Sequence, residues 1–258
     1  ARGADGGWYV MADRADAPAG AGFALENRII VSRTMPPGWH DPAVHRLAPF
    51  FLTLQNTLKS LGKQLADNPR IVLLSPGAKH PYYFEDVYLA RYLGYTLVEG
   101  ADLAVRDDRV FLKTLAGLAP IDVILSRGAE RGIDPLELGG GEPHGIPGLL
   151  RVIRERKVVV ANAPGCGLVE SPIFMAFLPQ VCRQLFGEEL QIPSIPTWWC
   201  GDPEQRELVR ERLGDLVIKP AFQASGGEEI VAGRLDAEGR RKLWARISAQ
   251  PYHYVAQD

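Results

Sequence analysis

The sequence predicts an α/β protein in which a doubly wound, mostly parallel sheet domain is joined to a small α+β lobe. Between residues 70 and 162, short apolar runs alternate with helical segments, which is typical of parallel strands with crossover helices. The last third of the chain has strands and helices without that strict alternation. The 258 residues, 46% of them hydrophobic, are enough for one large domain or two modest ones.

The charge balance and the cysteines exclude several classes of protein. With 29 Lys+Arg against 31 Asp+Glu, the net charge of −2 gives no reason to expect nucleic-acid binding. No apolar run approaches the roughly 20 residues of a spanning helix, so no membrane association is expected. The 3 cysteines form no CxxC pair. Reduced thiols in a cytoplasmic protein are therefore expected, rather than disulfides or a zinc site.

Short strands are expected in the first 33 residues, at 8–11, 24–25 and 29–31, around a loop at 17–22. A long amphipathic helix follows, with Asp41 as its N-cap and Pro42 near its start. Its apolar residues recur at steps of three and four, which places them on one face; they are Val44, Leu47, Phe51, Leu54, Leu58, Leu61 and Leu65.

The central region predicts four strands, at residues 71–75, 96–98, 121–125 and 158–160. Helices are expected at 85–93 and 146–156, and a hairpin at 103–112 that turns at Asp107-Asp108. In the last third, helices are predicted at 170–186, 203–213 and 236–247, the second with Asp202 as N-cap. Strands are predicted there at 216–219, 229–232 and 252–256.

The segment 217–227 carries the clearest chemical signal. Lys219 ends an apolar strand, and the glycines just beyond it would let backbone N–H groups approach an anion. This arrangement suits a phosphate clamp, although it is no Walker loop, because no GxxxxGK[ST] occurs and a strand follows. On the local pattern alone, a hairpin with a glycine turn and a solvated lysine is the simpler interpretation.

Two charged groups near the N-terminus form a second candidate site, Asp13-Arg14 and Glu26-Asn27-Arg28. Carboxylate and amide oxygens suit Mg²⁺, and neighbouring arginines could neutralise a transferred phosphoryl group or hold a carboxylate. The local alternative is a solvated strand edge.

Motifs spread along the whole chain resemble the circularly permuted ATP-grasp family, whose architecture is similar to that of glutathionylspermidine synthase and glutathione synthetase. The segments that carry the resemblance are 13–14, 17–20, 23–28, 46–51, 83–91, 98–103, 134–138, 160–170, 176–179, 196–201 and 217–222. Many members of that family have no assigned substrate.

The resemblance implies an ATP-dependent ligase that phosphorylates a carboxylate and lets an amine displace the phosphate. ATP and Mg²⁺ are then the expected cofactors, and small-molecule or peptide carboxylates and amines the expected substrates. Residues 1–40 would be strands of the permuted ATP-grasp large lobe, 41–165 a substrate-side domain of the kind that precedes the small lobe, and 166–258 the small lobe with its phosphate loop.

The resemblance also implies roles for individual residues. ATP would be bound by Lys219, by the loop of Ser225, Gly226 and Gly227, and by the hinge residues Gln257 and Asp258. Metal would be held by Glu26, Asn27 and Asp13, and transferred charge stabilised by Arg14 and Arg28. Substrate would meet Gly77, Tyr83, Glu85 and Arg127.

Two departures from the family pattern qualify these expectations. Residues 128–132 replace the acidic stretch expected after Arg127, so a substrate loop is expected to differ. The ATP-grasp hinge should continue beyond Asp258, so the chain is expected to be a piece of a longer protein. A non-catalytic ATP-grasp-like binding module or an inactive fragment is the alternative function. A nicotinamide-dependent Rossmann enzyme is disfavoured because the glycine fingerprint is absent.

Overall fold

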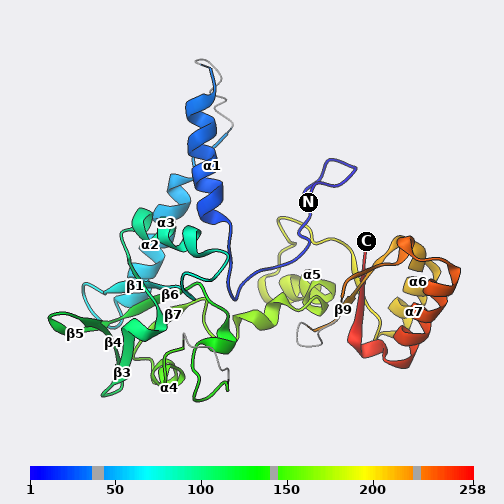
Figure 1. The fold of residues 1–258 in the computed structure, drawn as a ribbon. Coiled ribbons are helices and arrows are strands. Elements are labelled where there is room, and N and C mark those ends of the chain that lie inside the picture. The colour runs from blue at the N-terminus through cyan, green and yellow to red at the C-terminus, as the bar shows by residue number, and fades with distance from the viewer. Residues whose placement is uncertain (37–43, 140–144, 223–227) are drawn as a thin grey trace. The chain divides into compact units, whose positions relative to one another are not determined.

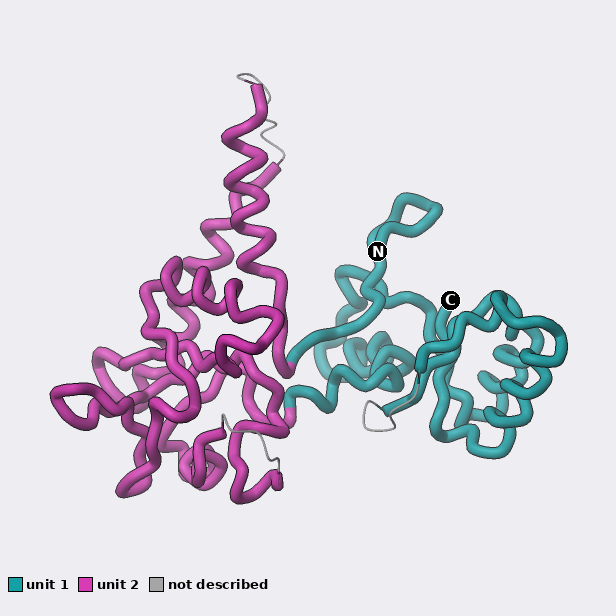
Figure 2. Tube along the Cα trace, viewed as in Figure 1, with its two compact units in different colours: residues 1–15, 166–258 teal, residues 16–165 magenta. Residues whose placement is uncertain are grey.

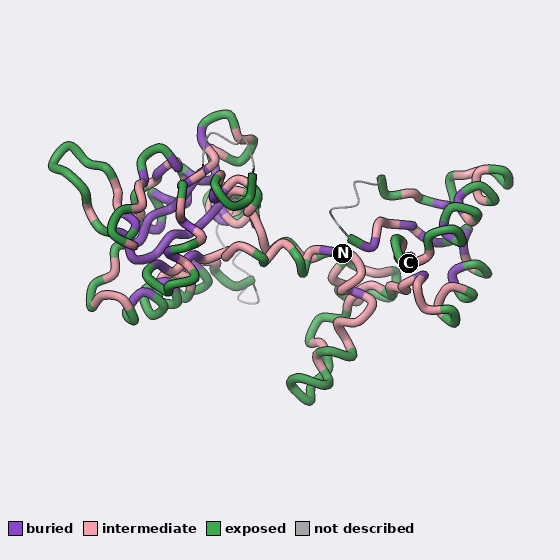
Figure 3. The backbone as a smooth tube through the Cα atoms, turned by 90° about the horizontal axis from the view of Figure 1, so that it is seen from below, coloured by how far each residue is buried: buried purple, intermediate pink, exposed green. Residues whose placement is uncertain are grey.

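The computed structural model describes residues 1–36, 44–139, 145–222 and 228–258. The chain forms two compact units (Figures 1 and 2). Unit 1 contains residues 1–15 and 166–258, and unit 2 contains residues 16–165. Each unit has its own buried interior (Figure 3).

Unit 2 is built on a parallel four-stranded sheet in the order β2-β1-β6-β7. The strands are β1 (Ile71–Leu74), β2 (Thr96–Val98), β6 (Val123–Ser126) and β7 (Val159–Ala161). The predicted parallel sheet is therefore confirmed. All four residues of β1 and of β6 are buried, as expected of strands covered on both faces.

Alternate residues of β1 enter different cores, because side chains alternate across a strand. Ile71 and Leu73 face a cluster that includes residues of α1 (Ala21–Thr34), α2 (Ala48–Gly62) and α3 (Tyr83–Leu93). Val72 and Leu74 face a second cluster on the other side of the sheet, which includes residues of α4 (Leu149–Arg154). Helices thus cover both faces, as a doubly wound sheet requires.

A three-stranded antiparallel sheet is inserted between β2 and β6, in the order β3-β4-β5. It contains β3 (Leu103–Arg106), β4 (Arg109–Thr114) and β5 (Gly117–Ile121). The predicted hairpin is confirmed: Asp107 and Asp108 both have positive φ, at 44° and 56°, as a tight two-residue turn requires.

The strand predicted at 121–125 is in fact two strands, β5 and β6, separated at Asp122. The buried Asp122 carboxylate accepts a hydrogen bond of 2.8 Å from the backbone N–H of Arg70. The sequence pattern, an apolar run with one aspartate, predicts a single strand, because nothing in it shows that the chain passes from one sheet to another at Asp122.

Two predictions for the first part of the chain are wrong. The strands expected at 24–25 and 29–31 lie within α1, whose Leu25 and Ile29 pack in the cluster with α3. This tertiary packing outweighs the β-branched run at 29–31. The next helix, α2, begins at Ala48 rather than near the predicted Asp41 cap, and Asp41 and Pro42 lie outside the described residues.

Unit 1 contains an antiparallel four-stranded sheet in the order β10-β9-β11-β8. Its strands are β8 (Thr197–Trp199), β9 (Val217–Pro220), β10 (Ile230–Val231) and β11 (Tyr254–Gln257). Helices α6 (Pro203–Glu211) and α7 (Ala237–Ala249) supply Val209, Leu243 and Ile247 to the core of this lobe. The predicted N-cap Asp202 is confirmed, since its side chain accepts from the N–H groups of Glu204 and Gln205.

The remaining helix of unit 1, α5 (Ile173–Phe186), continues through Pro179 and follows a 3₁₀ turn at Cys166–Glu170. Among the residues that the structure describes, no helix combines the length and the apolar character needed to cross a bilayer.

Gly62 tests the packing of α2 against the sheet. A Cβ at this position would lie 2.5 Å from Cβ of Pro69 and 2.7 Å from Cγ2 of Val123. Alanine normally favours a helix, but here we expect Gly62→Ala to lower the free energy of unfolding by about 1–3 kcal/mol through overpacking. Urea unfolding measures this. Gly214→Ala is the control, because a Cβ there meets nothing within 4 Å. Equal stability of the two variants would contradict the packing.

Cys200 tests the core of unit 1. This thiol is fully buried, and the burial raises its pKa to about 11, whereas Cys166 and Cys182 are partly exposed. Because the thiolate is the reactive form, we expect iodoacetamide at pH 8 to label Cys166 and Cys182 and to spare Cys200 until the chain unfolds. Peptide mass mapping measures the order, and early labelling of Cys200 would be inconsistent with the core described.

Candidate functional site

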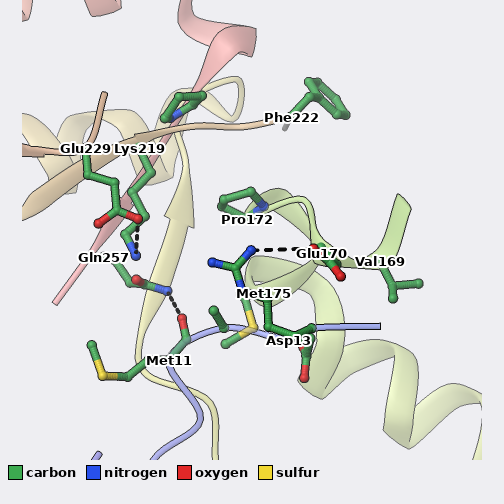
Figure 4. Close-up of a pocket in the computed structure, with 13 residues that line it drawn as sticks. Met11, Asp13, Val169, Glu170, Pro172, Met175, Lys219, Phe222, Glu229 and Gln257 are labelled. Atoms are coloured by element: carbon green, nitrogen blue, oxygen red, sulfur yellow. Dashed lines mark hydrogen bonds and ion pairs between the residues drawn. The ribbon is translucent and has the colours of Figure 1, made fainter. Parts of the chain in front are cut away.

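Unit 1 contains a pocket of about 180 Å³ at the end of β9 (Figure 4). It is lined by the N-terminal segment, the start of α5, and strands β9 and β11. The lining residues are Met11, Ala12, Asp13, Arg14, Val169, Glu170, Pro172, Met175, Lys219, Pro220, Phe222, Glu229 and Gln257. Lys219, Asp13, Arg14 and Gln257, all predicted from the sequence, are therefore brought together.

Lys219 is held rigidly in this pocket. It sits on β9, paired in register with Val255 of β11, and only 11% of its side chain is exposed. Its Nζ lies 3.3 Å from the Glu229 carboxylate, which is itself 66% exposed. A largely buried cation whose carboxylate partner is mostly exposed to solvent can exchange that partner for another anion at small cost.

A second ion pair lies on the opposite wall, between Arg14 and Glu170. Nη1 of Arg14 is 3.5 Å from Oε2 of Glu170, and the other carboxylate oxygen accepts a 2.6 Å hydrogen bond from the N–H of Ala15. The Arg14 side chain is 71% exposed and that of Glu170 only 7%. The buried carboxylate therefore fixes the N-terminal segment, and the guanidinium reaches the pocket from solvent.

Gln257 closes one side of the pocket. It is 2% exposed, and its Nε2 donates to Oγ1 of Thr197 at 3.1 Å and to the carbonyl of Met11 at 3.4 Å. Asp258 does not line the pocket; its carboxylate pairs with Arg212 at 2.5 Å. The predicted loop residues Ser225, Gly226 and Gly227 lie outside the described residues.

The other predicted metal and charge-stabilising residues belong to α1 in unit 2. Glu26 accepts a 2.8 Å hydrogen bond from the Tyr88 hydroxyl. Burial, and then this bond, raise the pKa of Tyr88 to about 12, so the hydroxyl stays protonated and keeps donating. Asn27 is exposed, and Arg28 donates to the carbonyl of Val44. Across the described residues, no group of three or more His, Cys, Asp or Glu side chains is arranged to hold a metal ion.

Two of the predicted substrate residues form a buried ion-pair network in unit 2. Arg127 lies 3.2 Å from Oε2 of Glu85 and 2.9 Å from Oδ1 of Asp86, and all three side chains are at most 7% exposed. The Ser75 hydroxyl donates to the other oxygen of Asp86 at 2.7 Å. These charges are satisfied within the protein, so neither Glu85 nor Arg127 presents a free group to a ligand.

The same network fixes the segment that leads into α1. The Glu85 carboxylate accepts from the N–H groups of Gly20 and Gly22 at 2.8–2.9 Å, and Arg127 donates to the carbonyl of Pro18. A Cβ at Gly22 would lie 2.8 Å from Cγ of Glu85, so glycine is needed for this approach.

Gly77 and Tyr83, the other two predicted substrate residues, lie near this network. Gly77 has φ of +102° and donates to Oγ of Ser75. Tyr83 begins α3 and packs edge-on against Phe84.

Sequence reasoning missed several residues of both arrangements. Glu229 was predicted only as the start of a strand, although its place next to the glycine loop could have marked it. Glu170 was predicted as the start of a helix and as part of a segment that carries the family resemblance. Asp86 gave no local sign of burial, because its partner Arg127 is 41 residues away, and Ser75 is buried through its bond to Asp86.

Several proteins are similar to this chain in sequence. A protein of Synechocystis with no assigned function is 32% identical over 252 residues, which is 98% of this chain and 52% of that protein. A functionally unassigned Mycobacterium tuberculosis protein is 33% identical over 254 residues, 98% of this chain and 28% of its own length. A Frankia casuarinae protein, provisionally named a glutamate–cysteine ligase, is 32% identical over 259 residues, 100% of this chain and 30% of that protein.

The chain thus spans about half the length of the first of these relatives and less than a third of the others. Among solved structures, a glutathione synthetase-like effector from Globodera pallida matches with a TM-score of 0.57 at 12% identity, over 100% of this chain and 57% of that one. That likeness supports the ATP-grasp type of fold. Residues 1–258 match the circularly permuted ATP-grasp type 2 family, and the chain belongs to that family.

Proposed function

We propose that this chain is part of an ATP-dependent ligase that joins a carboxylate to an amine through an acyl phosphate, and that the pocket of unit 1 binds ATP. The observation that carries the proposal is Lys219, a largely buried cation at the end of a strand, in a member of the ATP-grasp family. The names of the ligase-like relatives agree with this class of reaction.

The pocket offers complementary groups for a nucleotide. Lys219 supplies a fixed positive charge for phosphate oxygens, and Glu229, being mostly exposed, can release it. Met11, Met175 and Phe222 supply apolar surface that suits a purine ring. The amide of Gln257 lies in the same lining. Ser225, Gly226 and Gly227 remain the predicted phosphate loop, and Asp258 the predicted hinge.

The residues of this pocket fit a magnesium ion that is shared with phosphates. Mg²⁺ commonly uses one or two protein carboxylates and takes its other ligands from phosphate and water. Asp13 and Glu170 both line the pocket, although the Glu170 carboxylate is also bound to Ala15 and Arg14. When bound, the ion would neutralise phosphate charge. Glu26 and Asn27 stay predicted ligands from α1.

The proposed reaction has two balanced steps. A substrate carboxylate oxygen attacks the γ-phosphorus of ATP, the bond to the bridging oxygen breaks, and ADP leaves. An amine nitrogen then attacks the acyl carbon, phosphate leaves with the bonding electrons, and the amine gives up a proton. Arg14 would stabilise the negative charge of the transferred phosphoryl group, and the family resemblance predicts the same role for Arg28. Lys219 would hold the phosphates in place.

Lys219→Met tests the nucleotide site. This substitution keeps the aliphatic stem but removes the charge, so we expect Mg·ATP affinity to fall about 10- to 100-fold, the range for one lost hydrogen bond to a charged group. Isothermal titration measures the affinity. Lys242→Met is the matched control, because Lys242 pairs with Glu238 on an exposed helix face and lies outside the pocket. If both variants bind as the wild type does, the pocket is not the ATP site.

Asp13→Asn tests the metal contact separately. We expect ATP affinity in EDTA to stay close to that of the wild type, whereas the gain in affinity on adding Mg²⁺ should shrink about fivefold or more, since one oxygen ligand loses its charge. Titrations with and without Mg²⁺ measure that gain. Asp215→Asn, at an exposed position of the same unit, should leave the gain unchanged. An undiminished gain in Asp13→Asn would remove Asp13 from the proposed site.

A further inference from the structure

A second pocket, of about 290 Å³, lies within unit 2 at the carboxyl ends of β1 and β6. Its lining is drawn from the ends of these two strands and from the segments that follow them. The lining residues are Leu74, Ser75, Pro76, His80, Ser126, Gly128, Ala129, Arg131, Gly132 and Ile133.

The position of this pocket follows from the sheet topology. From β1 the chain continues to β2 on one side of β1, and later adds β6 on its other side. The direction of winding therefore reverses between β1 and β6. Open α/β sheets bind ligands in the crevice at the carboxyl ends of the strands where this reversal occurs.

The lining is mainly apolar, with the polar side chains of Ser75, Ser126, His80 and Arg131 among the apolar ones. Leu74, Pro76 and Ile133 provide hydrocarbon surface, and Arg131 and His80 provide nitrogen donors. Ligand pockets in proteins commonly have this composition, with an apolar wall and a few polar groups that orient the ligand. A volume of about 290 Å³ suits a small molecule rather than a peptide.

Two arginines at this edge differ in what they can do. Arg127 is buried and paired with both Glu85 and Asp86. Arg131 is exposed at the pocket, and among the described residues it forms no ion pair. It is therefore a cation available to an anionic ligand. His80 uses Nδ1 to accept a hydrogen bond from the N–H of Tyr82 at 3.4 Å, and its Nε2 has no partner in the described part of the chain.

The walls of the pocket are fixed by the network beneath it. Ser75 is 1% exposed and is bonded to both Asp86 and Gly77. Gly128 lies against Pro76 so closely that a Cβ would come within 3.2 Å of the proline ring. The wall at 128–132 contributes Gly128, Ala129, Arg131 and Gly132 to the lining.

We propose that this pocket binds a small organic carboxylate with an apolar body, whose carboxylate pairs with Arg131 and His80 while its hydrocarbon part lies against Leu74, Pro76 and Ile133. The proposal rests on the ligase function proposed above, since it names the class of acid that would be activated. Strongly polar, multiply charged acids are expected to bind less well, because Arg131 is the one guanidinium in the described lining and most of the wall is apolar.

The test measures the affinity of the whole chain for four probes by isothermal titration. The probes are propionate, hexanoate, 1-hexanol and hexylamine. Hexanoate should bind at least about tenfold more tightly than propionate, because three further CH₂ groups are buried. It should also bind at least about tenfold more tightly than hexanol and hexylamine, because only the carboxylate pairs with a guanidinium. The proposal would be overturned if propionate had the same affinity as hexanoate, or if hexylamine had the same affinity as either acid.

Variants locate the binding. Arg131→Met should lower hexanoate affinity about tenfold and leave hexanol unchanged, since only the charge contact is lost. Arg106→Met is the control, an exposed arginine of the same unit outside the pocket lining, and should bind hexanoate normally. Ala129→Leu should fill the cavity and remove binding of both probes, with circular dichroism confirming that it folds. Normal hexanoate binding in Arg131→Met would overturn the proposal.

Failure of the carboxylate pocket can be distinguished from failure of the proposed ATP site. Lys219→Met, in unit 1, should bind hexanoate as the wild type does. Normal Mg·ATP binding without hexanoate selectivity would overturn the carboxylate pocket alone. Hexanoate selectivity that depends on Arg131, without Mg·ATP binding, would support the pocket and overturn the ATP assignment.

Discussion

The arrangement of unit 2 depends on one buried guanidinium, that of Arg127, which joins two carboxylates on the same helix. Glu85 and Asp86 would repel each other if left alone in an apolar interior, and burying either without a partner would be costly. Arg127 offsets that cost, and the remaining carboxylate oxygens accept from Ser75, Gly20 and Gly22. The residual negative charge lies at the start of α1, where the helix dipole favours it. The ends of β1 and β6, the start of α3 and the entry to α1 are thereby fixed together.

The two units treat their charged groups differently. In unit 2 the buried charges of Arg127, Glu85 and Asp86 pair with one another. The exposed Arg131 nearby forms no ion pair among the described residues. In unit 1 the buried Lys219 is paired with a carboxylate that is mostly in water, so this cation can be recruited by a ligand. Burial alone therefore does not identify a functional group; what matters is whether its partner is fixed. The same criterion separates Arg127 from Lys219, although both were reasonable candidates by sequence.

Features that depend on local chemistry could be predicted from the sequence. The parallel sheet followed from apolar runs, the turn at Asp107-Asp108 from its residue types, and the cap of α6 from Asp202 before Pro203. Lys219 could be identified as a candidate because a strand end and a glycine loop are local patterns. The helix α1 could not be predicted in this way, because its start depends on Glu85, more than 60 residues away. Its Leu25 and Ile29 pack against the same distant helix, α3. Nor could Asp122 show that the chain changes sheets, since its partner Arg70 lies on a distant segment.

These distant pairings also explain why motifs alone are a poor guide to the roles of residues at the carboxyl ends of β1 and β6. A motif can mark Glu85 and Arg127 as candidate substrate residues, and Arg127 does lie between two residues that line the second pocket, Ser126 and Gly128. It cannot show that they neutralise each other, because that depends on the three-dimensional approach of α3 to the end of β6. Once they do, the charged or ring nitrogen groups left for the proposed ligand are those of Arg131 and His80, which lie among apolar walls. The segment 128–132 therefore supplies Arg131 to the lining of the pocket, and the buried charges next to it act by holding that segment's neighbours in place.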